Sequence, residues 1–441
     1  MRVLDQAAPV YAPHPIGPAA PIASWAAIPR VVIERVPTFA YTWDDDDPTV
    51  DWDASGKVWD DPAAGGGYVD AVCDFQAVEL AAGNPDELML FPAARAVVSL
   101  DNRTGRWTQY DESGRLIYFA PGRRLHVLAD YAGEAWWLFS GTIDTWDLQA
   151  DGSVAVEAHD RLAVLAAEIG TYTPGSGGTA AAQRLSDILT VAGDTGPTRF
   201  DPGGPALTAQ PTERSPLEEC QVVALSAGGI LYADADGTLL YRDQLWTRGR
   251  DDQPTVPVFS DNVCTGDAVV VWDAELSTDD EHLATKVTLT NVAGTTVTAT
   301  TNDPLLLQGQ PYPLTHPDPD QWTTAAQGQA VANATLNLYD KLTVGVRRFE
   351  LHLLDPTRSL WRTGIDMRLG DRIRFQHDFP VPSGVDVGTF DITAIVSTIT
   401  HEITPEAWVV GVGTTPAVAA TITQRWDRTQ WMWDQADAVW R

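Results

Sequence analysis

Two glycine-containing patterns in this sequence include residues that nucleotide chemistry requires. Gly56-Lys57 could end a phosphate-binding loop, but the upstream glycine is missing and Val58 stands where a magnesium-binding hydroxyl is needed. Gly411-Val412-Gly413 starts a dinucleotide-type pattern that breaks at its third glycine, and it follows a β-like run without opening a helix. Neither pattern predicts a nucleotide site.

The acidic runs are candidate cation sites. Asp234-Ala235-Asp236-Gly237 matches the start of an EF-hand loop, but no carboxylate stands at the twelfth position, where such a loop needs a bidentate acid. A hairpin turn is therefore the better interpretation. Asp44-Asp45-Asp46-Asp47 could chelate a metal ion or form a solvated charge run, and adjacent carboxylates that point in divergent directions favour the charge run.

Histidine and cysteine spacing points to no further site. His159-Asp160 could be a histidine with its orienting acid, but it precedes a predicted helix, which favours Asp160 as the N-cap. There is no His-Glu-x-x-His motif, and the three cysteines are far apart without a Cys-x-x-Cys pair. A glycosidase pair could exist among 60 acids, but none is marked. We therefore predict a non-enzymatic protein without catalytic residues, cofactor or bound metal.

Tryptophan is the unusual residue of this chain, with 17 copies against 11 tyrosines and 11 phenylalanines. Indole rings bury a large area and keep one N–H donor, which suits protein interfaces and sugar stacking. Seven of them fall in two windows outside the predicted strands and helices, so they either bind a partner or pack the chain ends onto their own domain. These candidate interface residues are Trp43, Trp52, Trp59, Trp426, Trp431, Trp433 and Trp440.

The composition limits the possible partners. The 441 residues suffice for two to four compact units of ordinary globular composition. Lysine and arginine number 29 against 60 acids, so that 29 − 60 = −31, and this charge disfavours tight binding to DNA or to an anionic membrane. No run of about 18 apolar residues occurs, and no apolar leader follows Met1. We expect a soluble protein made in the cytosol, without a membrane anchor.

Hydrophobic periodicity and turn residues predict an α+β fold that is rich in β-structure, with two small β-barrel domains flanking helix-hairpin α/β elements. Alternation of apolar and polar residues is clearest over 124–129 and 153–158. The predicted parts are a proline-rich arm with a Trp/Asp tract (1–69), a first β-barrel domain (70–170), helices with a helix-hairpin unit (171–280), a second β-barrel domain with a helix over 322–342 (281–415), and a Trp-rich tail (416–441).

Local signals place helices and a hairpin between the barrels. Apolar residues at helical spacing predict helices over 162–169 and 185–192. Ser215-Pro216-Leu217-Glu218 is the clearest helix start, because Ser at the N-cap and Glu at the third helical position form a capping box. Apolar runs on both sides of the turn at 234–237 predict a β-hairpin.

One sequence pattern occurs twice. Gly122-Arg123-Arg124-Leu125 is similar to Gly370-Asp371-Arg372-Ile373. Gly141-Thr142 lies 141 − 122 = 19 residues after the first glycine, and Gly388-Thr389 lies 388 − 370 = 18 residues after the second. The match reflects either duplication or convergent turn chemistry. Duplication predicts that residues 95–165 and 345–415 are two copies of one small β-barrel.

Several motifs, in order, resemble the minor tail proteins of siphophages that infect actinobacteria. The resemblance covers about residues 95–412. Its motifs are Leu100-Asp101-Asn102-Arg103-Thr104-Gly105-Arg106-Trp107, Pro121-Gly122-Arg123-Arg124-Leu125, Leu138-Phe139-Ser140-Gly141-Thr142-Ile143-Asp144, Ser215-Pro216-Leu217, Gly228-Gly229-Ile230-Leu231-Tyr232, Ala235-Asp236-Gly237-Thr238-Leu239 and Met367-Arg368-Leu369-Gly370-Asp371-Arg372-Ile373. The proline-rich arm and both tryptophan windows depart from the family.

The resemblance implies a virion protein at the tail tip, related to the central hub of tail baseplates. The implied assembly is a homotrimer of two-barrel subunits that closes the distal tail tube, and six similar barrels would match a sixfold tube. The implied partners are the distal tail protein, the tape measure protein and other tail-tip proteins, with transient passage of DNA. The alternative from the residues is a carbohydrate-binding or cell-wall-degrading virion or secreted protein that uses exposed tryptophans as sugar platforms.

Overall fold

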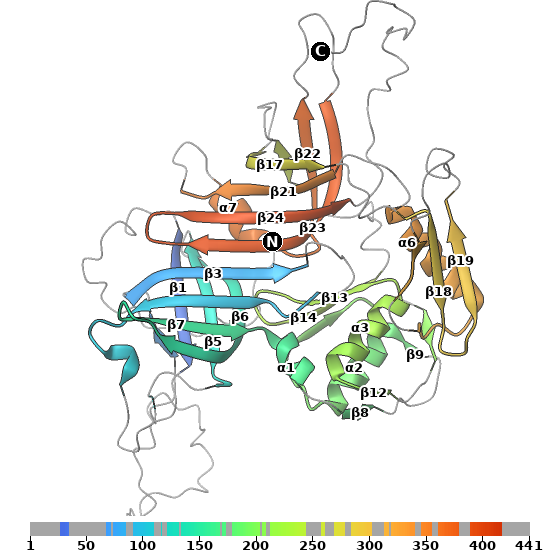
Figure 1. The fold of residues 1–441 in the computed structure, drawn as a ribbon, viewed down its shortest axis with the longest axis horizontal. Helices are drawn as coiled ribbons and strands as arrows, with labels where there is room; N and C mark the ends of the chain where they lie inside the picture. The colour runs from blue at the N-terminus through green and yellow to red at the C-terminus, as the bar shows by residue number, and fades with distance from the viewer. Residues whose placement is uncertain are drawn as a thin grey trace, which may run out of the picture.

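A computed structural model of the 441-residue chain shows a β-rich fold (Figure 1). The structure describes residues 27–34, 68–71, 74–84, 91–109, 116, 121–131, 134–167, 170–172, 179–202, 205–208, 212–243, 257–260, 269–277, 284–301, 313–316, 319–339, 345–354, 360–378 and 389–416.

A single large sheet contains 14 of the strands. They are β1 (Ala27–Glu34), β2 (Tyr68–Asp70), β3 (Phe75–Gly83), β4 (Arg95–Asp101), β5 (Arg124–Tyr131), β6 (Glu134–Leu148), β7 (Ser153–His159), β15 (Val258–Ser260), β16 (Val269–Val270), β17 (Trp272–Ser277), β21 (Gly345–His352), β22 (Arg372–Asp378), β23 (Thr389–Ile403) and β24 (Trp408–Pro416). The path runs β16-β15-β22-β23-β3-β4-β7-β6-β5-β1-β2, and β24, β21 and β17 continue from the other edge of β23.

Five strands of this sheet occur twice with the same connectivity. In the first repeat the spatial order is β3-β4-β7-β6-β5, and in the second it is β17-β21-β24-β23-β22. Every neighbouring pair in both repeats is antiparallel. The prediction that the two segments share one topology is confirmed, which favours duplication over coincidence.

The prediction that each repeat closes into a small β-barrel has to be corrected. The described residues contain no closed barrel. The physical reason lies in strand length. The middle strands β6 and β23 each have 15 residues, whereas β5 has eight and β22 has seven. Each middle strand therefore extends past its neighbour, and β3 pairs with the overhang of β23, so the sheet continues from one repeat into the other.

The glycine motif that occurs twice starts the β5 and β22 hairpins. Gly122 and Gly370 have φ of 81° and 78°, a left-handed conformation that favours glycine. The Gly122 N–H donates to the Ile143 carbonyl at 2.8 Å, and the Gly370 N–H donates to the Val396 carbonyl at 2.9 Å. The equivalence of these glycines is confirmed.

The Gly-Thr part of the predicted match is wrong. Gly141 lies opposite Leu125 in the middle of β6, whereas Thr389 lies opposite Asp378 at the first residue of β23. The counterpart of Val396 is Ile143, because the carbonyl of each accepts the hydrogen bond from the turn glycine of its repeat. Similar spacing along the chain predicts that the two Gly-Thr pairs are equivalent, but the strands pair in registers that do not align them.

The junction between the repeats is backbone pairing. Six consecutive pairs join β3 to β23, from Gly83 opposite Thr398 to Val78 opposite Ile403. The main hydrophobic core runs under both repeats without interruption, from Val98 and Val156 to Phe349 and Val410. The repeats consequently share one core and one sheet.

Helices α1, α2, α3 and α6 and the smaller strands gather at one end of this sheet, whereas α7 lies against the large sheet itself (Figure 1). The helices are α1 (Arg161–Ala167), α2 (Ala181–Val191), α3 (Pro216–Ser226), α6 (Ala325–Tyr339) and α7 (Trp361–Asp366), with a 3-10 turn η4 (Arg106–Thr108). The smaller strands are β8 (Gly170–Tyr172), β9 (Thr179–Ala180), β10 (Thr198–Phe200), β11 (Ala206–Leu207), β12 (Thr212–Arg214), β13 (Ile230–Ala233), β14 (Leu239–Arg242), β18 (Lys286–Thr290), β19 (Thr296–Thr300) and β20 (Pro313–Leu314).

The local predictions between the repeats are confirmed. The Ser215 side chain accepts from the Glu218 N–H at 3.2 Å, and the Glu218 carboxylate accepts from the Ser215 N–H at 3.0 Å. This capping box begins α3, and β13 and β14 form the predicted hairpin. Helices α1, α2 and α3 pack on that hairpin around a second core.

A third core lies between α6 and the β18-β19-β20 sheet. The helix expected over 322–342 is α6, and its Gly328 leaves room for the buried ring of Trp322. A buried hydrogen bond joins this unit to α3, in which the Gln321 side chain donates to the Glu219 carboxylate at 2.8 Å. Glu219 also forms an ion pair with Arg184 of α2 at 3.3 Å. Within the described part of the chain, no helix is long and apolar enough to cross a membrane.

A glycine-to-alanine pair tests the junction. Gly83 has φ of 95°, and a Cβ there would overlap the Ser397 carbonyl oxygen of β23. Gly122 has φ of 81°, but a Cβ there meets open space. We expect Gly83→Ala to lower the free energy of unfolding by more than about 2 kcal/mol. Gly122→Ala should lower it by about 1 kcal/mol, because only backbone strain acts there.

Denaturant unfolding of the two variants measures this difference. Equal losses would contradict a junction that depends on close approach of the β3 and β23 backbones.

Candidate functional site

The seven candidate interface tryptophans lie outside the described residues. Trp43, Trp52 and Trp59 belong to residues 35–67, and the other four, Trp426, Trp431, Trp433 and Trp440, belong to residues 417–441. The aspartate run at 44–47 and Gly56-Lys57 also fall outside the described part. The interface role of these tryptophans stays a prediction.

Two sequence patterns that could have carried chemistry have structural roles. The Asp160 Oδ1 accepts from the Leu162 N–H at 2.9 Å at the start of α1, which confirms the N-cap. His159 lies beside Glu157 instead, with Nε2 3.8 Å from a carboxylate oxygen. The Asp234–Gly237 segment forms the predicted hairpin turn, closed by the Asp234 N–H donating to the Thr238 carbonyl.

The outward sides of β4, β7 and β21 carry paired charges, and we call this part of the large sheet the polar face. In the first repeat the Arg95 guanidinium lies 2.5 Å from the Glu157 carboxylate, on the neighbouring strands β4 and β7. In the second repeat Arg348 lies 2.6 Å from Glu350, two residues along β21. Exposed pairs of this kind add little stability, but each places an acid beside an arginine. The arginines at these two places are therefore locally neutralised.

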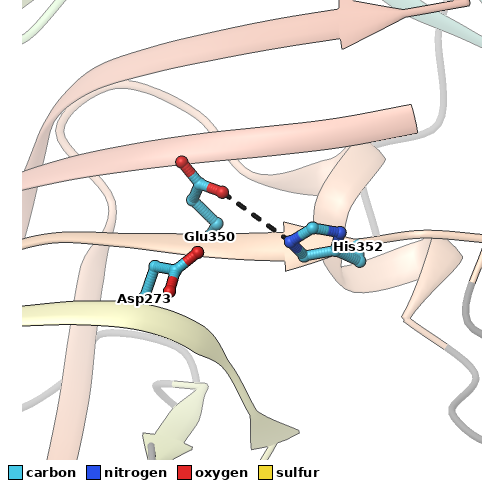
Figure 2. Close-up of side chains that lie close together, drawn as sticks. All are labelled: Asp273, Glu350 and His352. Carbon is cyan, nitrogen blue, oxygen red and sulfur yellow. Dashed lines mark ion pairs between the residues drawn. The ribbon is translucent and has the colours of Figure 1, made fainter. Parts of the chain in front are cut away.

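Sequence reasoning missed one cluster on this face. Asp273 from β17 lies beside Glu350 and His352 from β21, with one side-chain donor atom of each residue within 4.8 Å of the others (Figure 2). Asp273 has φ of 46°, at the irregular start of the β17–β21 pairing. Asp273 is more than 70 positions away from Glu350 and His352 in the sequence, so only strand pairing could reveal the cluster.

The cluster is better described as a charge network than as a metal centre. One Glu350 oxygen faces the Arg348 guanidinium at 2.6 Å, and the other faces His352 Nε2 at 3.7 Å. A cation would have to compete with the Arg348 guanidinium for this carboxylate. Divalent ions prefer several free carboxylate or imidazole donors, and here the central donor is already shared.

A small cavity lies where both repeats meet the β13–β14 hairpin. Its volume is about 50 Å³, and residues of β3, β6, β23 and the hairpin line it. Arg368, which precedes β22, contacts both the first repeat and the hairpin. Its guanidinium donates to the Trp137 carbonyl of β6 at 3.2 Å and lies 3.4 Å from the Asp234 carboxylate of the hairpin. The cavity is too small for an organic substrate and lies at a structural joint.

Burial controls the titration of two groups at this joint. Burial, together with the nearby Arg368 charge, lowers the pKa of His401 to about 3, and its Nδ1 accepts from the Trp408 indole N–H at 3.2 Å. Burial raises the pKa of Asp160 to about 7, although backbone N–H groups at its helix N-terminus act in the other direction. Both groups therefore favour the neutral form inside the fold.

Sequence comparisons find no relatives: no protein-family profile matches the chain, and no curated protein matches it. Solved structures do match. The tail protein from Neisseria meningitidis MC58 has a TM-score of 0.54 at 12% sequence identity, over 79% of this chain and 93% of that one. The 43 kDa tail protein of prophage MuSo2 from Shewanella oneidensis has a TM-score of 0.50 at 11% identity, over 88% and 98%.

The chain has the fold of these tail proteins. The match extends over nearly the whole length of both tail proteins and over most of this chain. The sequence-based resemblance to tail proteins is confirmed at the level of fold.

A pH series tests the buried histidine of this tail-protein fold. Since the folded pKa of His401 lies below the unfolded value near 6.5, the unfolded state binds the proton first, and stability is lost as pH falls from about 6.5 toward 3. His401→Asn keeps an acceptor for Trp408 but cannot be protonated. Between pH 7 and pH 5 we expect the wild type to lose about 2 kcal/mol more than this variant.

Urea unfolding at the two pH values measures the loss. Asp160→Asn is the contrasting variant, because the raised pKa of Asp160 makes its contribution disappear as pH rises from about 4 to 7. Parallel pH profiles of wild type and His401→Asn would contradict a neutral buried His401.

Proposed function

We propose that the chain is a non-enzymatic structural protein of a phage virion, and that it forms the trimeric hub of a siphophage tail tip. The observation that carries the proposal is the duplicated five-strand topology within a tail-protein fold. Three subunits with two like repeats supply six similar units, so a threefold hub can meet a sixfold tube. The actinobacterial host and the partners at the tail tip, the distal tail protein and the tape measure protein, rest on the sequence motifs.

The hub would close the distal end of the tail tube and let DNA pass. A conduit needs weak contact with phosphates, because a basic lining would hold them through counterion release. The net charge of −31 and the Arg95–Glu157 and Arg348–Glu350 pairs on the polar face support this role. We propose that this polar face lines the channel and that the two tryptophan windows contact neighbouring tail proteins.

The oligomeric state is the first test. Light scattering on the purified full-length chain should give a trimer mass, and labelled virions should show the protein at the tail tip. A protein that stays monomeric at high concentration and binds cell-wall glycan would instead support the carbohydrate-binding alternative.

Charge reversal tests the passive channel. The wild-type protein should not retain duplex DNA near physiological salt. Glu157→Lys removes the partner of Arg95 on the polar face and should produce DNA binding that weakens steeply as salt rises. Asp187→Lys on α2 makes the same change of charge away from the sheet and should not.

A gel-shift series in increasing salt reads out both variants. Strong DNA binding by the wild-type protein, or equal binding by both variants, would contradict the passive channel.

A further inference from the structure

The strand that follows the turn glycine begins with an arginine in both repeats. Arg124 is the first residue of β5 and Arg372 is the first residue of β22, each two positions after its turn glycine. The next residues, Leu125 and Ile373, are fully buried in the main core. Because side chains alternate along a strand, both arginines point away from that core. The two repeats therefore carry the same charged side chain at the same place and on the same side of the sheet.

Backbone hydrogen bonds establish this equivalence independently of residue type. In addition to the bonds from the turn glycines, the Ile143 N–H donates to the Arg123 carbonyl at 2.7 Å, and the Val396 N–H donates to the Asp371 carbonyl at 2.8 Å. Each of these carbonyls belongs to the residue directly before one of the two arginines. The turn residue itself has changed from a base to an acid, so the turn does not require a particular charge.

The residues that face the two arginines have also diverged. Arg124 lies opposite Thr142 in β6, whereas Arg372 lies opposite Ile395 in β23. Thr142 and Ile395 are counterparts, because each directly precedes the residue that bonds to the turn glycine. An arginine that stays the same while its facing neighbour changes from polar to apolar indicates a requirement that both repeats share.

The Arg372 charge has no bonded role inside the fold. Among the described residues, Arg372 has no hydrogen bond or ion pair, and its Nε is buried without a partner. Arg95 and Arg348 on the polar face are each paired with a glutamate. A half-buried guanidinium without an acceptor is costly, and it is unusual in a chain where acids outnumber bases by 60 to 29. Arg124 does interact within the chain, but it is exposed.

We propose that Arg124 and Arg372 bind acidic side chains on a neighbouring ring of sixfold symmetry, one arginine to each of its six subunits. A guanidinium binds a carboxylate through two parallel hydrogen bonds. Three copies of this chain present six such arginines, and their equivalent places in the two repeats let all six meet the same surface of the partner. The inference rests on the proposed trimeric hub, whose partner at the sixfold tube would be the distal tail protein.

A protein partner is favoured over DNA. The net charge of −31 repels phosphates, so two arginines per chain would act against the field of the whole subunit. A contact between proteins instead places each guanidinium directly against a carboxylate at short range. Both arginines also lie at the beginning of a strand, next to a turn, which places them at an end of the sheet and not in its middle.

Binding of the purified full-length chain to the purified distal tail protein tests the contact. Arg124→Glu and Arg372→Glu should each weaken this binding by about tenfold or more, because three of the six attractive contacts become repulsive. Arg372→Lys should retain part of the affinity, since it keeps the charge but not the planar fork. Arg199→Glu is the matched control, because Arg199 is exposed on β10, outside the large sheet, and should bind as the wild type does.

Thermal unfolding separates this role from a structural one. Arg372→Ala removes no hydrogen bond or ion pair of the described residues, so its melting temperature should stay within about 2 °C of the wild type while its binding falls. A larger fall in melting temperature would contradict the inference, because the retained charge would then serve the fold.

The outcomes also separate this contact from the hub itself. A trimeric wild-type protein that does not bind the distal tail protein, or whose Arg124 and Arg372 variants bind it as well as Arg199→Glu does, would overturn the contact and leave the trimer intact. Variants that assemble normal tails but change the rate of DNA ejection would place the arginines against DNA and overturn the contact as well. A monomeric wild-type protein that does not bind would overturn both proposals.

Discussion

Backbone pairing between β3 and the overhang of β23 is the interaction on which the rest of the structure depends. The backbone groups of a strand edge over a core need partners, since an unpaired buried N–H or carbonyl is costly. Here the partner comes from the other repeat, so one core runs beneath both. The left-handed Gly83 and the adjacent Ser397 carbonyl show how closely the two backbones approach.

The two repeats keep their hydrogen-bonding plan while their side chains differ. The bulges after Ile143 in β6 and Val396 in β23 align the two repeats, and this alignment matches Val97 with Arg348 and Leu148 with His401. Their surroundings differ as well. His401 is buried and its pKa is lowered by that burial, whereas Leu148 is exposed.

Burial accounts for the shifted groups at the joint between the repeats. The strongly shifted groups at the joint, Asp160 and His401, are shifted by burial inside the fold and face a cavity of about 50 Å³. Catalytic groups need substrate access as well as a shifted pKa. The charges on the polar face are instead paired, as Arg348 is with Glu350.

The sequence by itself determined the local elements: the capping box of Ser215 and Glu218, the hairpin turn at 234–237, and the turn glycines Gly122 and Gly370. These depend on neighbours within a few residues, so residue type and spacing predict them. Only the tertiary structure decided the register of β6 and β23, the pairing of β3 with β23 and the approach of Asp273 to Glu350. Strand pairing joins residues hundreds of positions apart, and a period of two describes one strand without naming its partner, because every alternating strand presents the same hydrogen-bonding edge.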